Sequence, residues 1–166
     1  AMSQLGNREP GIVGAVLDRP EVHAGLIADG IHVHAASMGA ALRAKRGPGH
    51  IFLVTDSMSQ TGTDLKTIEL NGRTITRADG ALRLADGTLA GADLDMIDAV
   101  NFVIDRLGLS PEEAFRMAAL YPARAIGVDD RLGHLRPSAE ASFVHLSGQR
   151  RVQSTWIAGT KVWGAD

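Results

Sequence analysis

The chain has 166 residues, roughly the length of one average domain; 45% of them are hydrophobic and 22% are charged. Its net charge of −2 and its 4% aromatic content argue against a surface for nucleic acid or for an anionic membrane. The absence of cysteine excludes disulfides and thiolate zinc sites and fits a reducing, cytoplasmic location. Because the sequence lacks a signal-peptide pattern and any apolar run of about 20 residues, we expect a soluble, unexported protein.

The first 56 residues alternate in the manner of a βαβ unit. A short apolar segment at 12–17 predicts a helix, and the apolar run at 22–28 predicts a strand that is buried on both faces. The stretch 35–46, rich in Ala, Met and Leu, predicts a second helix, and 51–54 predicts a second buried strand. These elements together predict two parallel strands joined by a crossover helix.

The pattern changes at about Asp64. Short β-type runs at 67–70, 73–77 and 81–84 are separated by Asn-Gly or Asp-Gly dipeptides, which are typical of hairpin turns. We therefore expect a β-meander insert over about residues 66–90. From Leu94 the apolar residues recur with a helical period, and Gly108 follows at the place where a helix C-terminus favours glycine.

A second helix is predicted to begin at Ser110. The sequence Ser110-Pro111-Glu112-Glu113 combines an N-cap, a proline in the first turn and a glutamate at the third helical position, which is the pattern of a capping box. This helix is expected to reach about Leu120, with one more helical turn over 121–127. The tail over 142–163 again has β character, with turns at Gln149 and Gly159.

Asp56 is the most suggestive single residue for chemistry. It follows a fully apolar strand, and the carboxyl ends of strands are where active sites of α/β folds form. The alternative is that Asp56 belongs to an ordinary turn or helix cap. The residue type and its position leave both interpretations open.

His32 and His34 are two residues apart, which would place both imidazoles on one face of a strand. They could form a metal pair, or bind an anion at the N-terminus of the helix that starts at Ala35. Alternatively, one of them simply begins the helix and faces solvent. No second Cys or His pair has the spacing to complete a metal site. The remaining histidines are interpreted as structural or surface residues: His23, His50, His134 and His145.

Two further segments could contact an anionic ligand. Arg8 lies in a turn-forming cluster and could clamp a carboxylate or phosphate with its planar guanidinium, although a solvated loop arginine is an equally good interpretation. The segment Gly87–Gly91 could let backbone groups approach a ligand closely, but it lacks the Gly-Lys-[Ser/Thr] ending of a phosphate loop. From the residues alone, the sequence indicates an enzyme acting on an anionic small molecule.

The order of several segments resembles the N-acetylglucosamine-6-phosphate deacetylases of the amidohydrolase superfamily. The resemblance spans essentially the whole chain, with similar spacing throughout. Its segments are Ala1-Met2, Arg8-Glu9-Pro10-Gly11, Ile27 to Val33, Leu53 to Asp56, Gly87 to Gly91 and Leu120 to Gly127. No single segment is decisive, but the ordered set is specific.

The resemblance implies a role for each matched residue. Asp56 corresponds to the general base, and later acid, of acetamide hydrolysis, and His32 to a contact with the substrate, which displaces the metal-pair interpretation. Arg8 corresponds to a phosphate-binding arginine that reaches the neighbouring subunit's site. Ala1 corresponds to a backbone contact, and Leu89, Ala90 and Gly91 correspond to a loop that lines the substrate. These assignments imply N-acetylglucosamine 6-phosphate as substrate, with glucosamine 6-phosphate and acetate as products.

The family's metal ligands, one Glu and two His, lie in an N-terminal part that precedes the segments matched here. The resemblance therefore implies an α/β chain that forms the C-terminal part of a TIM-like (β/α)8 barrel over 1–134, with the β-hairpin insert, and part of a small β-sandwich over 135–166. Ser138 and Ser142 depart from the glycine and aspartate that the superfamily has at the start of this β domain.

The missing ligands define what we expect of the chain by itself. The complete enzymes use a divalent metal, zinc or iron, whereas we expect none in this chain, which is then inactive alone. A homodimer, or association with the absent N-terminal part, is the expected assembly. One alternative is a non-catalytic fragment that self-associates or pairs with another chain, because barrel strands expose edges and apolar faces. The other is an amidohydrolase of another amide specificity.

Overall fold

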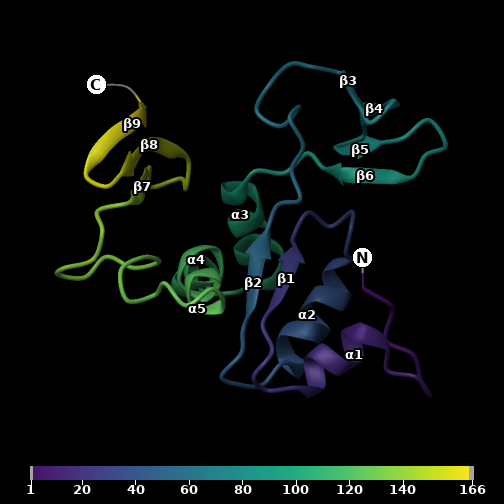
Figure 1. Cartoon of the computed structure of the whole chain (residues 1–166), viewed down its shortest axis with the longest axis horizontal. Helices are drawn as coiled ribbons and strands as arrows, with labels where there is room; N and C mark the ends of the chain where they lie inside the picture. The colour runs from purple at the N-terminus through teal and green to yellow at the C-terminus, as the bar shows by residue number, and fades with distance from the viewer. Residues whose placement is uncertain (1, 165–166) are drawn as a thin grey trace.

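The computed structural model describes residues 2–164, which form three β-sheets and a group of helices (Figure 1). The chain is α/β, as predicted. The helices are α1 (Gly11–Asp18), α2 (Ala35–Ala44), α3 (Met96–Leu107), α4 (Pro111–Phe115), the π-helical turn η1 (Arg116–Leu120) and α5 (Tyr121–Ala125). The strands are β1 (Ala24–Ile27), β2 (Ile51–Val54), β3 (Thr67–Leu70), β4 (Arg73–Ala78), β5 (Ala81–Arg83), β6 (Leu89–Ala92), β7 (Phe143–Leu146), β8 (Val152–Ile157) and β9 (Thr160–Gly164).

The predicted βαβ unit is confirmed, but its first strand is shorter than predicted and is not buried on both faces, because Gly25 is exposed and only Leu26 is buried in β1. Strands β1 and β2 are parallel and in register from Ala24 opposite Ile51 to Ile27 opposite Val54, and α2 makes the crossover. The α2 helix begins after His34, whose Nδ1 accepts a hydrogen bond from the Ala36 amide at 3.2 Å. His34 therefore caps a helix, which is one of the alternatives considered from the sequence.

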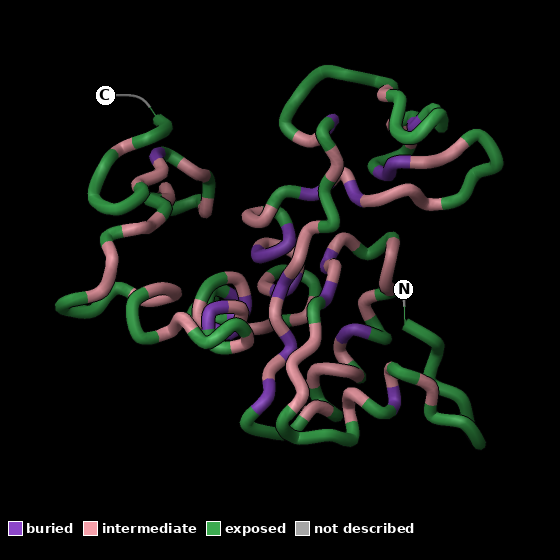
Figure 2. The backbone as a smooth tube through the Cα atoms, in the orientation of Figure 1, coloured by how far each residue is buried: buried purple, intermediate pink, exposed green. Residues whose placement is uncertain are grey.

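The hydrophobic core surrounds β1 and β2 (Figure 2). Strand β2 contacts α3, η1 and α5, so one face of the small parallel sheet is covered by the helices that follow the insert. The predicted apolar face of α3 is buried as expected, and Gly108 ends that helix with a φ of 70°. The largest core side chains come from every layer of this unit: Met38, Leu53, Val100, Val103 and Met117.

The helix predicted from Ser110 is continuous in space but changes its winding at η1. Ser110 caps it as expected, with its Oγ accepting a hydrogen bond from the Glu113 amide at 3.2 Å. The reciprocal half of the capping box is not formed, because the Glu113 carboxylate instead accepts from the Tyr121 hydroxyl at 2.9 Å. Pro122 lacks an N–H and cannot continue the α-helical ladder, which accounts for the wider turn before α5.

The β-meander insert is also confirmed, and it contains one strand more than predicted. Strands β3, β4, β5 and β6 form an antiparallel sheet in chain order. The segment Leu89–Ala92, expected as a loop, is β6 and pairs with β5 through an irregular register between Ala81 and Arg83. The sequence pattern hid this strand because Gly91 lies within it and Gly87 lies shortly before it, and glycine is untypical of strands.

The C-terminal sheet of β7, β8 and β9 lies apart from the core in Figure 1, beyond the connection over 126–142. It is antiparallel, as the tail predicted, and Phe143 stacks on Trp156 with ring centroids 5.7 Å apart. Several of its apolar side chains remain exposed, among them Val144 at 50% and Trp163 at 58%. Among the described helices, none has the length and apolar character needed to cross a membrane.

Candidate active site

Two aspartates follow the two parallel strands at equivalent positions. Ile27 lies opposite Val54 at the carboxyl ends of β1 and β2, and Asp29 and Asp56 each come two residues later. Because the strands are parallel and in register, both carboxylates start from the same edge of the sheet. This is the edge at which α/β proteins build their sites.

Asp56 adopts a left-handed backbone conformation with a φ of 54° and is exposed. Aspartate tolerates this conformation better than most residues do. Its carbonyl oxygen accepts a hydrogen bond from the Ala92 amide at 2.8 Å, and the adjacent Ser57 hydroxyl donates to the Leu94 carbonyl. Within residues 2–164 the Asp56 carboxylate has no hydrogen-bond or ion-pair partner, so its backbone is fixed while its acid group stays open to a ligand.

Asp29 is in the opposite situation. Its Oδ1 accepts hydrogen bonds from the Ile31 and His32 amides at 2.9 Å, and its Oδ2 lies 2.6 Å from His32 Nδ1. The two side chains are 9% and 14% exposed. Burial raises the pKa of Asp29, but the hydrogen bonds from His32 and the two amides outweigh it and hold that pKa below its ordinary value. Asp29 is therefore an ionised carboxylate that orients the imidazole.

Sequence reasoning missed this role of Asp29. The available signal was the spacing Asp29-x-x-His32 directly after a buried strand, which lets one carboxylate close a turn and reach the imidazole. The contact also fixes His32: with Nδ1 directed to Asp29, Nε2 is the ring nitrogen left for a ligand. His32 and His34 thus have separate roles and do not form a pair.

Strand β6 lies beside the backbone of Asp56. Ser57 and Ala92 form an isolated parallel bridge, which draws β6 to the segment that follows β2 (Figure 1). Gly91 has a φ of 125°, and a Cβ at this position would lie 2.7 Å from Met58 Cγ and 3.2 Å from the Asp56 carbonyl oxygen. Glycine is needed here for both its conformation and its close approach. The structure thus brings Leu89, Ala90 and Gly91 to the Asp56 side of the molecule.

The structure does not connect the other two predicted contacts to this site. Arg8 is exposed in a turn closed by a Gly6 amide to Glu9 carbonyl hydrogen bond of 3.2 Å. Its guanidinium forms no hydrogen bond or ion pair with any residue that the structure describes. Ala1 lies outside the described residues. The roles implied for Arg8 and Ala1 stay predictions.

A second polar cluster lies at the amino end of β2, away from Asp56. His50 stacks on Tyr121 with ring centroids 3.8 Å apart, and its amide donates to His23 Nδ1 at 3.2 Å. Burial lowers the pKa of His50, and the charge of Arg124 lowers it further. Burial and the Glu113 carboxylate raise the pKa of Tyr121. His23 and His50 thus contribute to local structure, in line with their interpretation from the sequence.

The described residues do not by themselves offer a metal centre. In the part of the chain that the structure describes, no three His, Cys, Asp or Glu side chains are grouped so that they could hold a metal ion. An open groove of about 610 Å³ does exist, but it lies between α4 and the C-terminal sheet, with Phe115, Phe143 and Trp156 in its wall. This groove is apolar and contains none of the predicted site residues.

Comparison with known proteins gives a consistent assignment. A protein of Escherichia coli (strain K12) with the provisional name N-acetylgalactosamine-6-phosphate deacetylase is 40% identical over 158 residues, which cover 95% of this chain and 93% of that protein. The N-acetylglucosamine-6-phosphate deacetylase of Haemophilus influenzae is 35% identical over 96% of this chain and 42% of its own length. The crystal structure of the Pasteurella multocida N-acetylglucosamine-6-phosphate deacetylase matches with a TM-score of 0.90 and 32% identity, over 97% of this chain and 42% of that one.

The family model agrees with these relatives. The model of the amidohydrolase family matches residues 13–162, which include Asp29, His32, Asp56 and β6. The chain therefore spans about two-fifths of the Haemophilus and Pasteurella proteins and nearly all of the Escherichia coli protein. The family inferred from the order of sequence motifs is confirmed, and this chain belongs to the amidohydrolase family.

Proposed function

We propose that this chain contributes the proton-transfer carboxylate and part of the substrate site of an enzyme that deacetylates N-acetylhexosamine 6-phosphates. The observation that carries the proposal is that the open carboxylate of Asp56 and the partly buried Asp29–His32 pair follow the carboxyl ends of two neighbouring parallel strands. Relatives named for both the glucosamine and the galactosamine substrate support the substrate class. N-acetylglucosamine 6-phosphate is our first candidate substrate, and its galactosamine epimer is the alternative.

Asp56 has the properties that the two proton transfers require. As a carboxylate without a partner in residues 2–164, it can accept a proton from the water that attacks the acetamide carbonyl carbon. The same proton then passes from Asp56 to the amide nitrogen as the C–N bond breaks, which releases the amine and acetic acid. The second water proton leaves on the acetic acid, which ionises at neutral pH to give acetate while the amine takes up a proton, and Asp56 ends the cycle as a carboxylate.

His32 has the geometry of a substrate-binding group. Asp29 holds its Nδ1 at 2.6 Å, which leaves Nε2 to contact a sugar hydroxyl or a phosphate oxygen. We propose that Leu89, Ala90 and Gly91 line the substrate site, because β6 lies against the Asp56 backbone. Arg8 is assigned to the phosphate, in keeping with its planar, permanently charged guanidinium.

A divalent metal, zinc or iron, is implied by the family resemblance and would polarise the acetamide and the attacking water when bound. The described residues do not fit such an ion without further ligands, because Asp56 lies in no group of three candidate ligands. We further propose that β1 and β2 are neighbouring strands of a (β/α)8 barrel within 1–134, and that 135–166 belongs to a small β-sandwich. A cytoplasmic location stays a prediction.

Association is the second candidate function, favoured by exposed apolar side chains. Leu135 is 74% exposed, Ile157 is 54% exposed and Trp163 is 58% exposed. Both edges of the two-stranded parallel sheet are also unpaired among the described strands. Such surfaces commonly drive association, so we propose a homodimer or pairing with a further polypeptide. Light scattering tests this proposal, because a monomer at all accessible concentrations with a cooperative melt would contradict it.

The catalytic proposal is tested by mapping ligand binding onto the chain. N-acetylglucosamine 6-phosphate should shift the backbone amide resonances of residues 29–32, 56–57 and 89–92, while unphosphorylated N-acetylglucosamine should shift them less. With added zinc, the chain alone should bind no stoichiometric ion and release no acetate. Shifts confined to other regions would contradict the site, and turnover by the 166-residue chain that survives Asp56→Asn would contradict the role of Asp56.

A further inference from the structure

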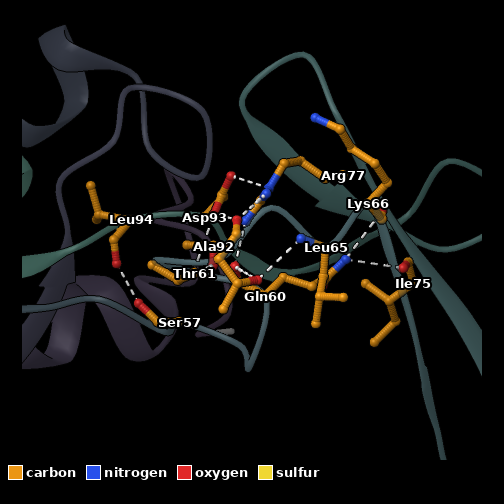
Figure 3. A network of polar contacts seen from close by, with 11 residues as sticks. Ser57, Gln60, Thr61, Leu65, Lys66, Ile75, Arg77, Ala92, Asp93 and Leu94 are labelled. Carbon is orange, nitrogen blue, oxygen red and sulfur yellow. Dashed lines mark hydrogen bonds and ion pairs between the residues drawn. The ribbon is translucent and has the colours of Figure 1, made fainter.

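The segment over 57–66, which follows Asp56, is tied to the insert sheet by the side chains of Arg77 and Gln60 (Figure 3). Arg77, on β4, donates from Nη1 to the Thr63 carbonyl at 2.8 Å and from Nη2 to the Gln60 carbonyl at 2.5 Å. Its backbone amide also donates to the Lys66 carbonyl at 2.8 Å. A single residue thus holds three carbonyl groups of the segment.

The same guanidinium is paired with Asp93, the residue that follows β6. Nη2 donates to Asp93 Oδ1 at 3.1 Å, and Nε lies 2.7 Å from Oδ2 in a close ion pair that lacks the alignment of a hydrogen bond. The Thr61 hydroxyl also donates to Asp93 Oδ1 at 3.3 Å. Because the Arg77 and Asp93 side chains are only 17% and 18% exposed, solvent screens this pair less than an ordinary surface pair.

These contacts converge on the backbone of Asp56. Asp93 directly follows Ala92, whose amide donates to the Asp56 carbonyl and whose carbonyl accepts from the Thr61 hydroxyl at 3.4 Å. Gln60 is fully buried, and its side-chain amide donates to the carbonyls of Lys66 and Ile75. The neutral hydrogen bonds of Gln60 attach the segment to the sheet, whereas the charged fork of Arg77 joins that segment to Asp93 and hence to β6.

We propose that Arg77 is a positioning residue for the Asp56 site. It holds the segment after Asp56 and the end of β6 in one fixed arrangement, and this sets the distance between the Asp56 acid group and the wall formed by Ala90 and Gly91. The importance of this positioning for substrate rests on the proposed function. The positioning itself is a property of the folded chain and is measurable without catalysis.

Hydrogen exchange of the Ala92 amide tests the positioning directly, because that amide donates to Asp56. In Arg77→Met, exchange at Ala92 and over 57–66 should be about tenfold faster, while exchange in β1 and β2 stays unchanged. Arg77→Lys keeps the charge but not the planar fork, so its exchange should be intermediate. The matched control is Arg73→Met, on the same strand with an exposed side chain, and it should leave Ala92 unchanged.

Ligand affinity distinguishes a positioning role from a purely structural one, because a purely structural role would leave the dissociation constant unchanged. The dissociation constant for N-acetylglucosamine 6-phosphate should rise about tenfold in Arg77→Met, recover in part in Arg77→Lys and stay constant in Arg73→Met. Unchanged exchange at Ala92, or equal acceleration in β1 and β2, would overturn the positioning role. If the unmutated chain binds no sugar phosphate, the proposed function fails, while the exchange comparison still decides whether Arg77 positions Asp56.

Discussion

Replacing Asp29 with asparagine removes a negative charge while leaving the shape of the side chain nearly unchanged. The asparagine oxygen can still accept from the Ile31 and His32 amides, so the loss is confined to the charged contact with His32 Nδ1 at 2.6 Å. Hydrogen bonds to charged groups contribute about 1.5–3 kcal/mol. Because both side chains retain some solvent contact, we expect Asp29→Asn to lower the free energy of unfolding by about 1–2 kcal/mol.

The pH dependence of this loss identifies its cause. A carboxyl group whose pKa is lower in the folded chain stabilises the fold at pH values above its unfolded pKa, about 4, and this contribution disappears as the pH falls through the folded pKa. The free energies of unfolding of the two proteins, measured with urea, should therefore differ by the full amount at pH 7 and by progressively less below about pH 4. Asp64→Asn, at an exposed position, is the matched control and should show no loss. A loss of unfolding free energy below about 0.3 kcal/mol at pH 7 would refute the reasoning, because changes at independent sites add only to within roughly that amount. A loss that stays the same below pH 3 would refute it as well.

Three further predictions concern the core, the site backbone and the second polar cluster. Leu53→Ala empties a position that is 2% exposed and should lower the free energy of unfolding by about 2–5 kcal/mol, as measured by urea unfolding. Gly91→Ala forces a φ of 125° on a residue with a Cβ and should cost about 1–3 kcal/mol while altering the amide resonances of 56–58; unchanged resonances would contradict the close approach. His50, whose pKa is lowered by burial and by Arg124, favours its neutral form in the fold, so stability should fall as the pH drops below about 6.5, and His50→Gln should weaken this dependence.

Local chemistry accounts for the parts of the fold that the sequence predicted. Asn71-Gly72 and Asp79-Gly80 specify hairpins through residues that accept a positive φ, and the apolar runs before Asp29 and Asp56 specify parallel strands, although Gly25 on β1 is exposed. The position of Asp56 at the end of β2 was predictable because the apolar run before it specifies the strand, while its catalytic role stays a prediction.

The features that escaped prediction depend on contacts between distant segments. Arg77 lies on β4 and Asp93, 16 residues later, directly follows β6, and neither has a local pattern that distinguishes it from a surface charge. Strand β6 forms because β5 and the Ser57 backbone offer it partners, and these outweigh the poor strand propensity of its glycine. The turn η1 depends on Pro122, whose effect extends back into the preceding helical turn.

The two strand-end carboxylates have different environments, and this difference supports the proposal that Asp56, and not Asp29, transfers the proton. Asp29 already accepts two amide hydrogen bonds and pairs with His32, so protonating it would break contacts that the fold depends on. In Asp56 only the backbone is held, by the Ala92 amide, and the carboxylate has no partner within residues 2–164, which supports the role proposed for it. Equivalent positions on neighbouring strands thus differ: Asp29 orients the imidazole of His32, and Asp56 is the carboxylate to which we assign proton transfer.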